Sequence, residues 1–262
     1  MDTPLIEINN ATVWRGSTRV LQNFNLTIGQ HERVAILGPN GSGKTTLLKT
    51  IAQELRPVIQ DNSWVKILGH RRWNVWSLRQ HFGLVSQDLQ AEFTPNARVL
   101  DVIVSGFFAT MGVHAHQIDE ISAEQLECAK AVMASMGVQS LESREYRTLS
   151  TGQQRRCLLG RALVHKPKML IFDEPTSGLD MTASLDFLER VGKLVRSGCG
   201  LVWVTHHLND IPPETERVIV LKDGVIAVDG PKEAVLKPDV LSRVFETDVR
   251  VAKVDGYYFV YP

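Results

Sequence analysis

The sequence has little of what marks secreted or nucleic-acid-binding proteins. Its 262 residues include only three cysteines, and none stands in a C-x-x-C pair. This argues against a disulfide framework or a zinc site and favours a reducing compartment. Lysine plus arginine equals aspartate plus glutamate at 29 each, so no basic excess suggests a surface for nucleic acid or an anionic membrane.

Long apolar segments are also missing. No uninterrupted apolar run approaches the roughly 20 residues that a membrane-spanning helix needs. The first residues, Met1 to Leu5, lack the positive segment and apolar core of a secretion signal. We therefore expect a soluble, cytoplasmic protein that does not insert into a membrane and that reaches one only through a partner.

The pattern of apolar residues predicts an α/β protein, and the 44% hydrophobic content is enough for one large domain or two modest ones. Alternating segments near the N-terminus predict half-exposed antiparallel strands, and short continuous apolar runs further on predict buried strands. An Asp-Gly pair between two apolar runs predicts a late hairpin. The predicted strands cover residues 5–8, 21–28, 33–37, 65–69, 82–86, 168–172, 201–204, 217–221, 225–228 and 257–260.

A helical block interrupts these strands between about Val99 and Arg147, with glycines marking its breaks. We interpret residues 99–147 as an α-helical subdomain inserted into a core formed by residues 1–98 and 148–262. Further helices are predicted over 44–54, 183–197 and 232–236, and residues 149–165 are predicted to form a loop followed by a helix. The whole chain then reads as one domain with an N-terminal antiparallel β subdomain.

A glycine-rich loop lies between a predicted buried strand and a predicted helix. It reads Gly38, Pro39, Asn40, Gly41, Ser42, Gly43, Lys44, Thr45, a full match to G-x-x-x-x-G-K-[ST]. Backbone amides of such a loop and the positive end of the following helix bind phosphate oxygens. Lys44 is expected to reach the β- and γ-phosphates of ATP, and the Thr45 hydroxyl to ligate Mg²⁺.

Two acidic residues, Asp173 and Glu174, follow the apolar run Met169 to Phe172. They therefore stand at the carboxyl end of a buried strand, where ligands bind in open parallel sheets. Asp173 is expected to hold Mg²⁺ through water, and Glu174 to act as the general base toward the attacking water. Taken alone, the pair could also be a solvated strand end.

The stretch Leu149, Ser150, Thr151, Gly152, Gln153 lies between these two motifs. With it, the chain resembles the ATP-binding cassette (ABC) ATPases, whose signature is usually written LSGGQ. The resemblance implies a P-loop NTPase core and a head-to-tail dimer, in which the signature of one subunit completes the ATP site of the other. Ser150 and Gly152 would contact the γ-phosphate of the ATP bound to the other subunit. Thr151 stands where the signature usually has a glycine.

Further positions acquire roles only from this resemblance. Gln87 matches the glutamine that senses Mg²⁺ and the attacking water, and residues 177–180 match the D-loop. His206 matches the switch histidine at the γ-phosphate, although His207 beside it could compete. Trp14 stands where an aromatic residue stacks on adenine, but it could equally be a core residue. Thr46 and Gln153 complete the expected nucleotide contacts.

The resemblance also implies partners. A second cassette, in a homodimer, and a separate integral membrane permease are expected, which would place the chain at the cytoplasmic face of the membrane. The segment from Val240 onward resembles the tail of importer ATPases for iron-siderophore, cobalamin and related metal chelates. A soluble, non-transport ABC ATPase acting on ribosomes, DNA or signalling is the alternative. His114 and His116, without acidic or cysteine companions, are interpreted as exposed residues rather than metal ligands.

Overall fold

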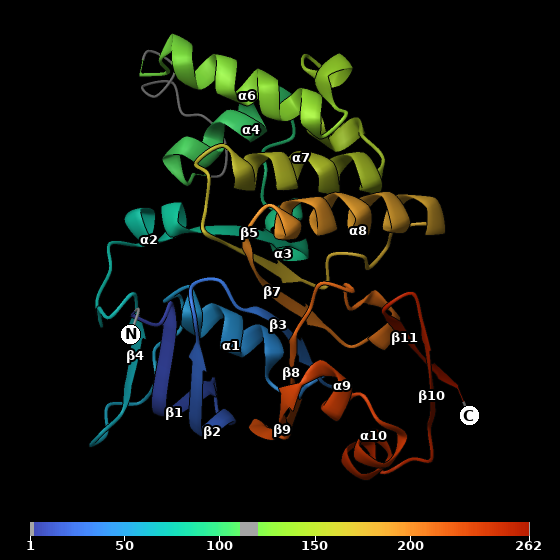
Figure 1. Cartoon of the computed structure of the whole chain (residues 1–262). Helices are drawn as coiled ribbons and strands as arrows, with labels where there is room; N and C mark the ends of the chain where they lie inside the picture. Colours follow the sequence, from blue (N-terminus) through green and yellow to red (C-terminus); the bar gives the residue numbers. More distant parts are fainter. Residues whose placement is uncertain (1–2, 111–119, 262) are drawn as a thin grey trace. The chain divides into compact units, whose positions relative to one another are not determined.

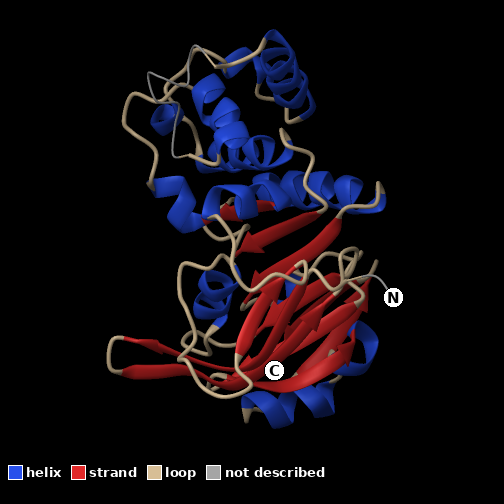
Figure 2. Ribbon diagram, turned by 90° about the vertical axis from the view of Figure 1, so that its left-hand side faces the viewer, coloured by secondary structure: helices blue, strands red, loops and turns tan. Residues whose placement is uncertain are grey.

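The computed structural model in Figure 1 describes residues 3–110 and 120–261, so His114 and His116 lie outside the described part. The chain divides into two compact units, Met1–Val75 with Val195–Pro262, and Trp76–Leu194. Strands dominate the first unit and helices the second, as the red and blue ribbons of Figure 2 show. No helix of the described ranges is long and apolar enough to cross a membrane.

An antiparallel sheet opens the first unit. Its strands are β1 (Ile6–Arg15), β2 (Thr18–Ile28) and β4 (Trp64–Ile67), in the order β2-β1-β4. Ile6 pairs with Ile28 on one side and Ile67 on the other, and all three side chains are buried. The predicted antiparallel β subdomain is therefore confirmed. β4 stops at Ile67 because Leu68 and Gly69 turn the backbone to positive φ.

Four further strands of the first unit lie side by side. They are β3 (Arg33–Leu37), β7 (Gly200–Thr205), β8 (Arg217–Lys222) and β9 (Val225–Pro231). β7, β3 and β8 run parallel, and β8 turns back into antiparallel β9 at Asp223 and Gly224. Both turn residues have positive φ, as the predicted Asp-Gly hairpin requires. β7 is buried over its whole length, as expected for a strand covered on both faces.

The C-terminal segment forms α9 (Lys232–Val235), α10 (Pro238–Phe245) and a hairpin of β10 (Arg250–Val254) and β11 (Tyr257–Tyr261). The buried Lys232 ammonium fastens this hairpin. It donates to the carbonyls of Pro212 at 3.0 Å, Pro213 at 3.3 Å and Gly256 at 3.0 Å. Burial lowers the pKa of Lys232 to about 8. The strand β11 was predicted from the sequence over residues 257–260, whereas the helix α10 was not.

The second unit contains two parallel strands, β5 (Phe82–Ser86) and β6 (Met169–Asp173). Its helices are α2 (Val75–His81), α3 (Gln87–Ala91), α4 (Val99–Phe108), α6 (Ala123–Ser135), α7 (Thr151–Leu163) and α8 (Met181–Arg196). Short 3-10 helices cover Gln139–Leu141 and Tyr146–Thr148 here, and Leu208–Asp210 in the first unit. The fold class is thus the predicted α/β class with mostly parallel core strands.

α4 and α7 pack against each other unusually closely (Figure 1). A Cβ on Gly106 would lie 2.3 Å from the carbonyl oxygen of Arg161, so only glycine permits this crossing. Arg161 is buried and bonds back to α4 and its end, at 3.2 Å to Ser105 Oγ and 3.0 Å to the Thr110 carbonyl. This packing fixes the direction of α7, the helix that begins at the signature sequence.

Candidate nucleotide site

The phosphate loop connects β3 to α1 (Lys44–Ile51), the strand-loop-helix setting that the motif requires. Gly41 and Gly43 have φ of 84° and 106°, a conformation that residues with a side chain rarely adopt. A Cβ on Gly38 would lie 2.4 Å from the Leu221 carbonyl oxygen. The glycines are therefore required by backbone shape and close approach, and the loop can present amides to an anion.

The loop buries two polar side chains, Ser42 and Lys44. Ser42 Oγ is buried and has no hydrogen-bond partner within the described ranges. The Lys44 ammonium is also buried, and it donates to the carbonyls of Gly38 at 2.7 Å and Pro39 at 3.1 Å. An orphaned hydroxyl and a cation beside a glycine loop at a helix N-terminus fit a phosphate group. Thr45 and Thr46 follow on the first turn of α1, Thr45 half-buried and Thr46 buried.

His206 leaves the sheet beside the phosphate loop. Leu37 pairs with Thr205 in the parallel register of β3 and β7, so Gly38 and His206 follow neighbouring strands at the same edge. The two imidazoles of His206 and His207 contact each other, with ring centroids 3.8 Å apart, and His207 is the more exposed. The described structure thus places the expected switch histidine next to the phosphate loop within one unit.

Trp14 lies near the end of β1, opposite Arg19 of β2, at an irregular point of the pairing. Its side chain is 46% exposed. An indole with this exposure is not a core residue, so its face is available for stacking on a base. By contrast, Trp73 is half-buried and donates its indole N–H to the Ile67 carbonyl at 2.9 Å.

The second unit gathers a different group of expected site residues. Ser86 pairs with Asp173 in the parallel register of β5 and β6, which brings Gln87, Asp173 and Glu174 to one edge of this pair. Gln87 is exposed and begins α3, whose N-cap is Ser86. Asp173 and Glu174 are half-buried. An amide oxygen and a carboxylate oxygen are ligands that Mg²⁺ accepts, so the donor set fits the expected metal.

Glu174 has a φ of 48°, in the left-handed region that residues other than glycine rarely occupy. The turn that follows returns a hydrogen bond from the Ser177 amide to the Glu174 carbonyl at 3.2 Å. Such backbone strain costs on the order of 1–3 kcal/mol and clusters at functional sites. Here it bends the chain directly after the strand, where the sequence predicts a general base.

The signature sequence forms the start of α7. Ser150 is its N-cap and accepts from the Gln153 amide at 3.3 Å, while the Gln153 side-chain carbonyl accepts from the Ser150 amide at 3.0 Å. This capping box orients the helix N-terminus, a position that favours anions. Ser150 is exposed and Gly152 half-buried, with a Cβ on Gly152 placed 2.9 Å from Ala183. Thr151 is exposed, so its side chain is not needed for packing.

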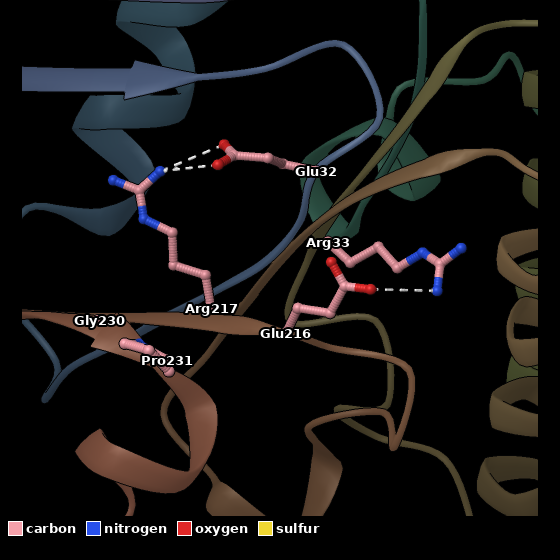
Figure 3. A pocket seen from close by; sticks show the side chains of 6 residues that line it. All are labelled: Glu32, Arg33, Glu216, Arg217, Gly230 and Pro231. Atoms are coloured by element: carbon pink, nitrogen blue, oxygen red, sulfur yellow. Dashed lines mark hydrogen bonds and ion pairs between the residues drawn. The ribbon is translucent and has the colours of Figure 1, made fainter.

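A separate pocket of about 380 Å³ lies at the amino ends of β3 and β8 (Figure 3). Its lining residues are Glu32, Arg33, Glu216, Arg217, Gly230 and Pro231. The charges pair with each other: Arg33 with Glu216 at 3.4 Å, and Arg217 with Glu32 at 3.2 Å. Arg217 also pairs with Asp229 at 2.7 Å, and this hydrogen bond raises the pKa of Arg217. Because the phosphate loop follows the opposite end of β3, this pocket is not the nucleotide site.

The expected residues therefore form two groups, one in each unit. Trp14, the loop residues Gly38 to Thr46 and His206 belong to the first unit, and Gln87, Ser150, Gly152, Gln153, Asp173 and Glu174 to the second. Sequence reasoning missed one buried group near the second set, the guanidinium of Arg155. The signal was weak, because Arg155 and Arg156 stand side by side in a helix that reads as amphipathic.

Comparison with known proteins identifies the family. The family model described as ABC transporter matches residues 21–177. The hemin import ATP-binding protein HmuV of Rhodopseudomonas palustris (strain HaA2) is 30% identical over 98% of this chain and 97% of its own length. The glutamine transport ATP-binding protein GlnQ of Escherichia coli is 32% identical over 92% of this chain and 98% of its own length.

Solved structures share the fold. An inward-facing ABC transporter assigned to the metal-chelate type has a TM-score of 0.77 at 21% identity, covering 98% of this chain and 96% of its own. A dimeric ATP-binding cassette bound to ADP and Pi has a TM-score of 0.71 at 27% identity, covering 86% and 98%. The chain belongs to the ABC transporter family, as an ATP-binding and ATP-hydrolysing subunit.

Proposed function

We propose that two copies of this chain bind two MgATP head to tail, each γ-phosphate lying between the phosphate loop of one copy and the signature of the other. The observation that carries this proposal is the phosphate loop itself. Its glycines adopt positive φ, its lysine is buried beside it, and Ser42 Oγ lacks a hydrogen-bond partner in the described ranges. The signature offers a capped helix N-terminus with the exposed Ser150.

Each residue then has a distinct task. Lys44 exchanges the loop carbonyls that it now contacts for β- and γ-phosphate oxygens. His206 donates a hydrogen bond to the γ-phosphate from an imidazole N–H. Glu174 accepts the proton of the attacking water, a role worth typically 10²- to 10⁴-fold in rate. Trp14 stacks on adenine through its exposed indole.

Thr45, Gln87 and Asp173 are the residues that would hold Mg²⁺. Bound there, the ion would neutralise phosphate charge and orient the nucleotide. The hydroxyl, amide and carboxylate oxygens match its preference for hard ligands. Thr46, on the first turn of α1, and Gln153, on the first turn of α7, would complete the contacts to the nucleotide.

Closure and reopening of this dimer would drive a separate membrane permease. A dimeric cassette among the structural neighbours supports the homodimer, and the relatives named for hemin import support an importer at the cytoplasmic face of the membrane. The metal-chelate type neighbour and the hemin relatives favour a metal chelate as cargo. The glutamine relative provides the contrasting class of cargo for a test.

Purification of the tagged chain from detergent-solubilised membranes tests this proposal. We expect an integral membrane protein to co-purify, and the reconstituted complex to hydrolyse ATP faster with a metal chelate present than with glutamine present. Lys44→Ala should co-purify with the permease but hydrolyse no ATP. Recovery of the chain with ribosomes or DNA and without any membrane protein would instead support the soluble, non-transport alternative.

A further inference from the structure

Arg155 is a buried arginine that forms no ion pair within the described part of the chain. It lies on the second turn of α7, and its side chain is 1% exposed. Among the described residues, its side chain makes one hydrogen bond, from Nη2 to the Ser177 carbonyl, which is long at 3.5 Å. Nε and Nη1 have no partner, and no carboxylate forms an ion pair with it, among the residues that the structure describes.

The neighbouring arginine, Arg156, has the ion pair that Arg155 lacks within the described ranges. Arg156 is part-exposed and forms an ion pair with Asp186 of α8 at 3.2 Å, and Asp186 also pairs with Arg190 at 2.9 Å. Burying a guanidinium without such partners destabilises the folded state, because its hydration is lost and little replaces it. Burial accordingly lowers the pKa of Arg155. Packing alone therefore does not explain an arginine at position 155.

The surroundings of Arg155 are the motifs of the proposed site. Ser177, whose carbonyl it contacts, opens the D-loop segment that follows Glu174. Asp173, at the end of β6, lies close enough to raise the pKa of Arg155 by its charge. The buried Tyr146, which precedes the signature, also lies near Arg155, and its hydroxyl has no partner in the described part of the chain. The side chain of Arg155 thus connects the signature helix to the D-loop segment and lies near the acidic strand end.

We propose that Arg155 is a positioning residue, which ties the signature helix to the D-loop and to the Asp173 strand end within one subunit. This inference rests on the proposed function, in which the signature serves the partner's ATP while Asp173 and Glu174 serve the subunit's own. Arg155 then fixes the position of the signature relative to Asp173 and Glu174 within one chain. The buried Nε and Nη1 groups, which have no partner in the described ranges, lower the stability of the fold in exchange for this positioning.

The decisive test compares Arg155→Met with its neighbour Arg156→Met. Met keeps much of the volume and removes the buried charge, so Arg155→Met should raise the melting temperature by a few degrees. It should bind ATP within about twofold of wild type yet hydrolyse it at least about 10-fold more slowly. Arg156→Met should lose stability and keep turnover within about threefold. A stability loss with unchanged turnover in Arg155→Met would overturn the proposal.

Two further measurements keep the test sharp. If Arg155→Met fails to fold, Arg155→Gln offers a smaller polar change, and the same split between ATP binding and turnover is expected for it. In a Glu174→Gln background, Arg155→Met should prevent the ATP-trapped dimer that Glu174→Gln alone forms. Failure of Glu174→Gln alone to dimerise would contradict the proposed function, whereas equal dimerisation of both proteins would contradict only the role of Arg155.

Discussion

Leu37 and Thr205 face each other in the parallel pairing of β3 and β7, and this register sets the phosphate loop beside His206, the expected switch histidine. The chain leaves both strands at the same edge, through Gly38 and His206. Two segments that are some 170 residues apart in the sequence therefore meet without any loop having to reach across. The buried strands β3 and β7 thus fix the positions of the residues that follow them, and those residues carry the functional side chains.

His206→Ala is expected to lower ATP turnover at least about 100-fold while changing ATP affinity less than about fivefold. The imidazole would contact only the γ-phosphate and would stabilise it during hydrolysis, whereas most of the ATP affinity comes from contacts to the rest of the nucleotide. Steady-state turnover and equilibrium ATP binding measure the two effects separately.

His207→Ala is the matched control, because it removes the more exposed ring that contacts His206 at 3.8 Å between centroids. We expect turnover within about threefold of wild type. The opposite pattern, with His207→Ala inactive and His206→Ala active, would transfer the switch role to His207.

Ser150→Arg is expected to leave ATP binding to a single subunit intact and to abolish ATP turnover. The larger, charged side chain would stand where the partner's γ-phosphate is proposed to dock. Loss of the capping box should also cost about 1 kcal/mol of stability. Equilibrium ATP binding, turnover and urea denaturation report the three quantities.

Ser122→Arg separates the cap from the phosphate contact. Ser122 caps α6 by an equivalent box with Gln125, at 3.0 and 3.1 Å, and carries no proposed nucleotide role. It should lose similar stability and keep turnover. Equal turnover in both variants would refute a site completed by the signature.

The sequence predicts those features whose cause is local. The apolar run of β3, the glycine loop after it and the Asp-Gly hairpin at Gly224 all follow from residue type and spacing, and the structure confirms each. The predicted helix over 44–54 instead ends at Ile51, since Gln53 adopts a φ of 57°. Helix α10 was missed although Leu241 and Val244 are buried at helical spacing behind Pro238.

Features that depend on tertiary packing could not be predicted. Arg155 and Arg156 are adjacent and chemically identical, yet one is buried near the D-loop and the other pairs with Asp186 at the helix surface. The helix phase alone does not reveal which arginine faces inward when the neighbours are unknown. The positive φ of Glu174 likewise arises from the turn that follows β6, not from any preference of glutamate.

His165 should make stability sensitive to acid. Its Nε2 donates to the Phe82 carbonyl at 3.3 Å, and burial lowers the pKa of His165 to about 4 from an ordinary value near 6.5. Between these two pH values the unfolded chain binds a proton that the folded chain does not, so stability is lost as the pH falls from 6.5 toward 4. The loss from this group is at most about 3 kcal/mol.

Urea denaturation at pH 7.0 and pH 5.0 measures this effect. We expect His165→Asn to show a smaller drop in unfolding free energy between the two pH values than wild type. His31→Asn, a substitution at an exposed histidine, is the control and should keep the wild-type drop. An unchanged drop in His165→Asn would mean that another group causes the acid sensitivity.

Glu174→Gln tests the central claim, a site completed by two copies with Glu174 as the general base. Gln keeps the shape and binding contacts but cannot accept the proton, so turnover should fall by about 10²- to 10⁴-fold while ATP stays bound. Light scattering of Glu174→Gln with MgATP should give twice the 29.3 kDa of one chain, and one chain's mass without nucleotide. ATP bound to a protein that remains monomeric, or wild-type turnover in this variant, would contradict the account.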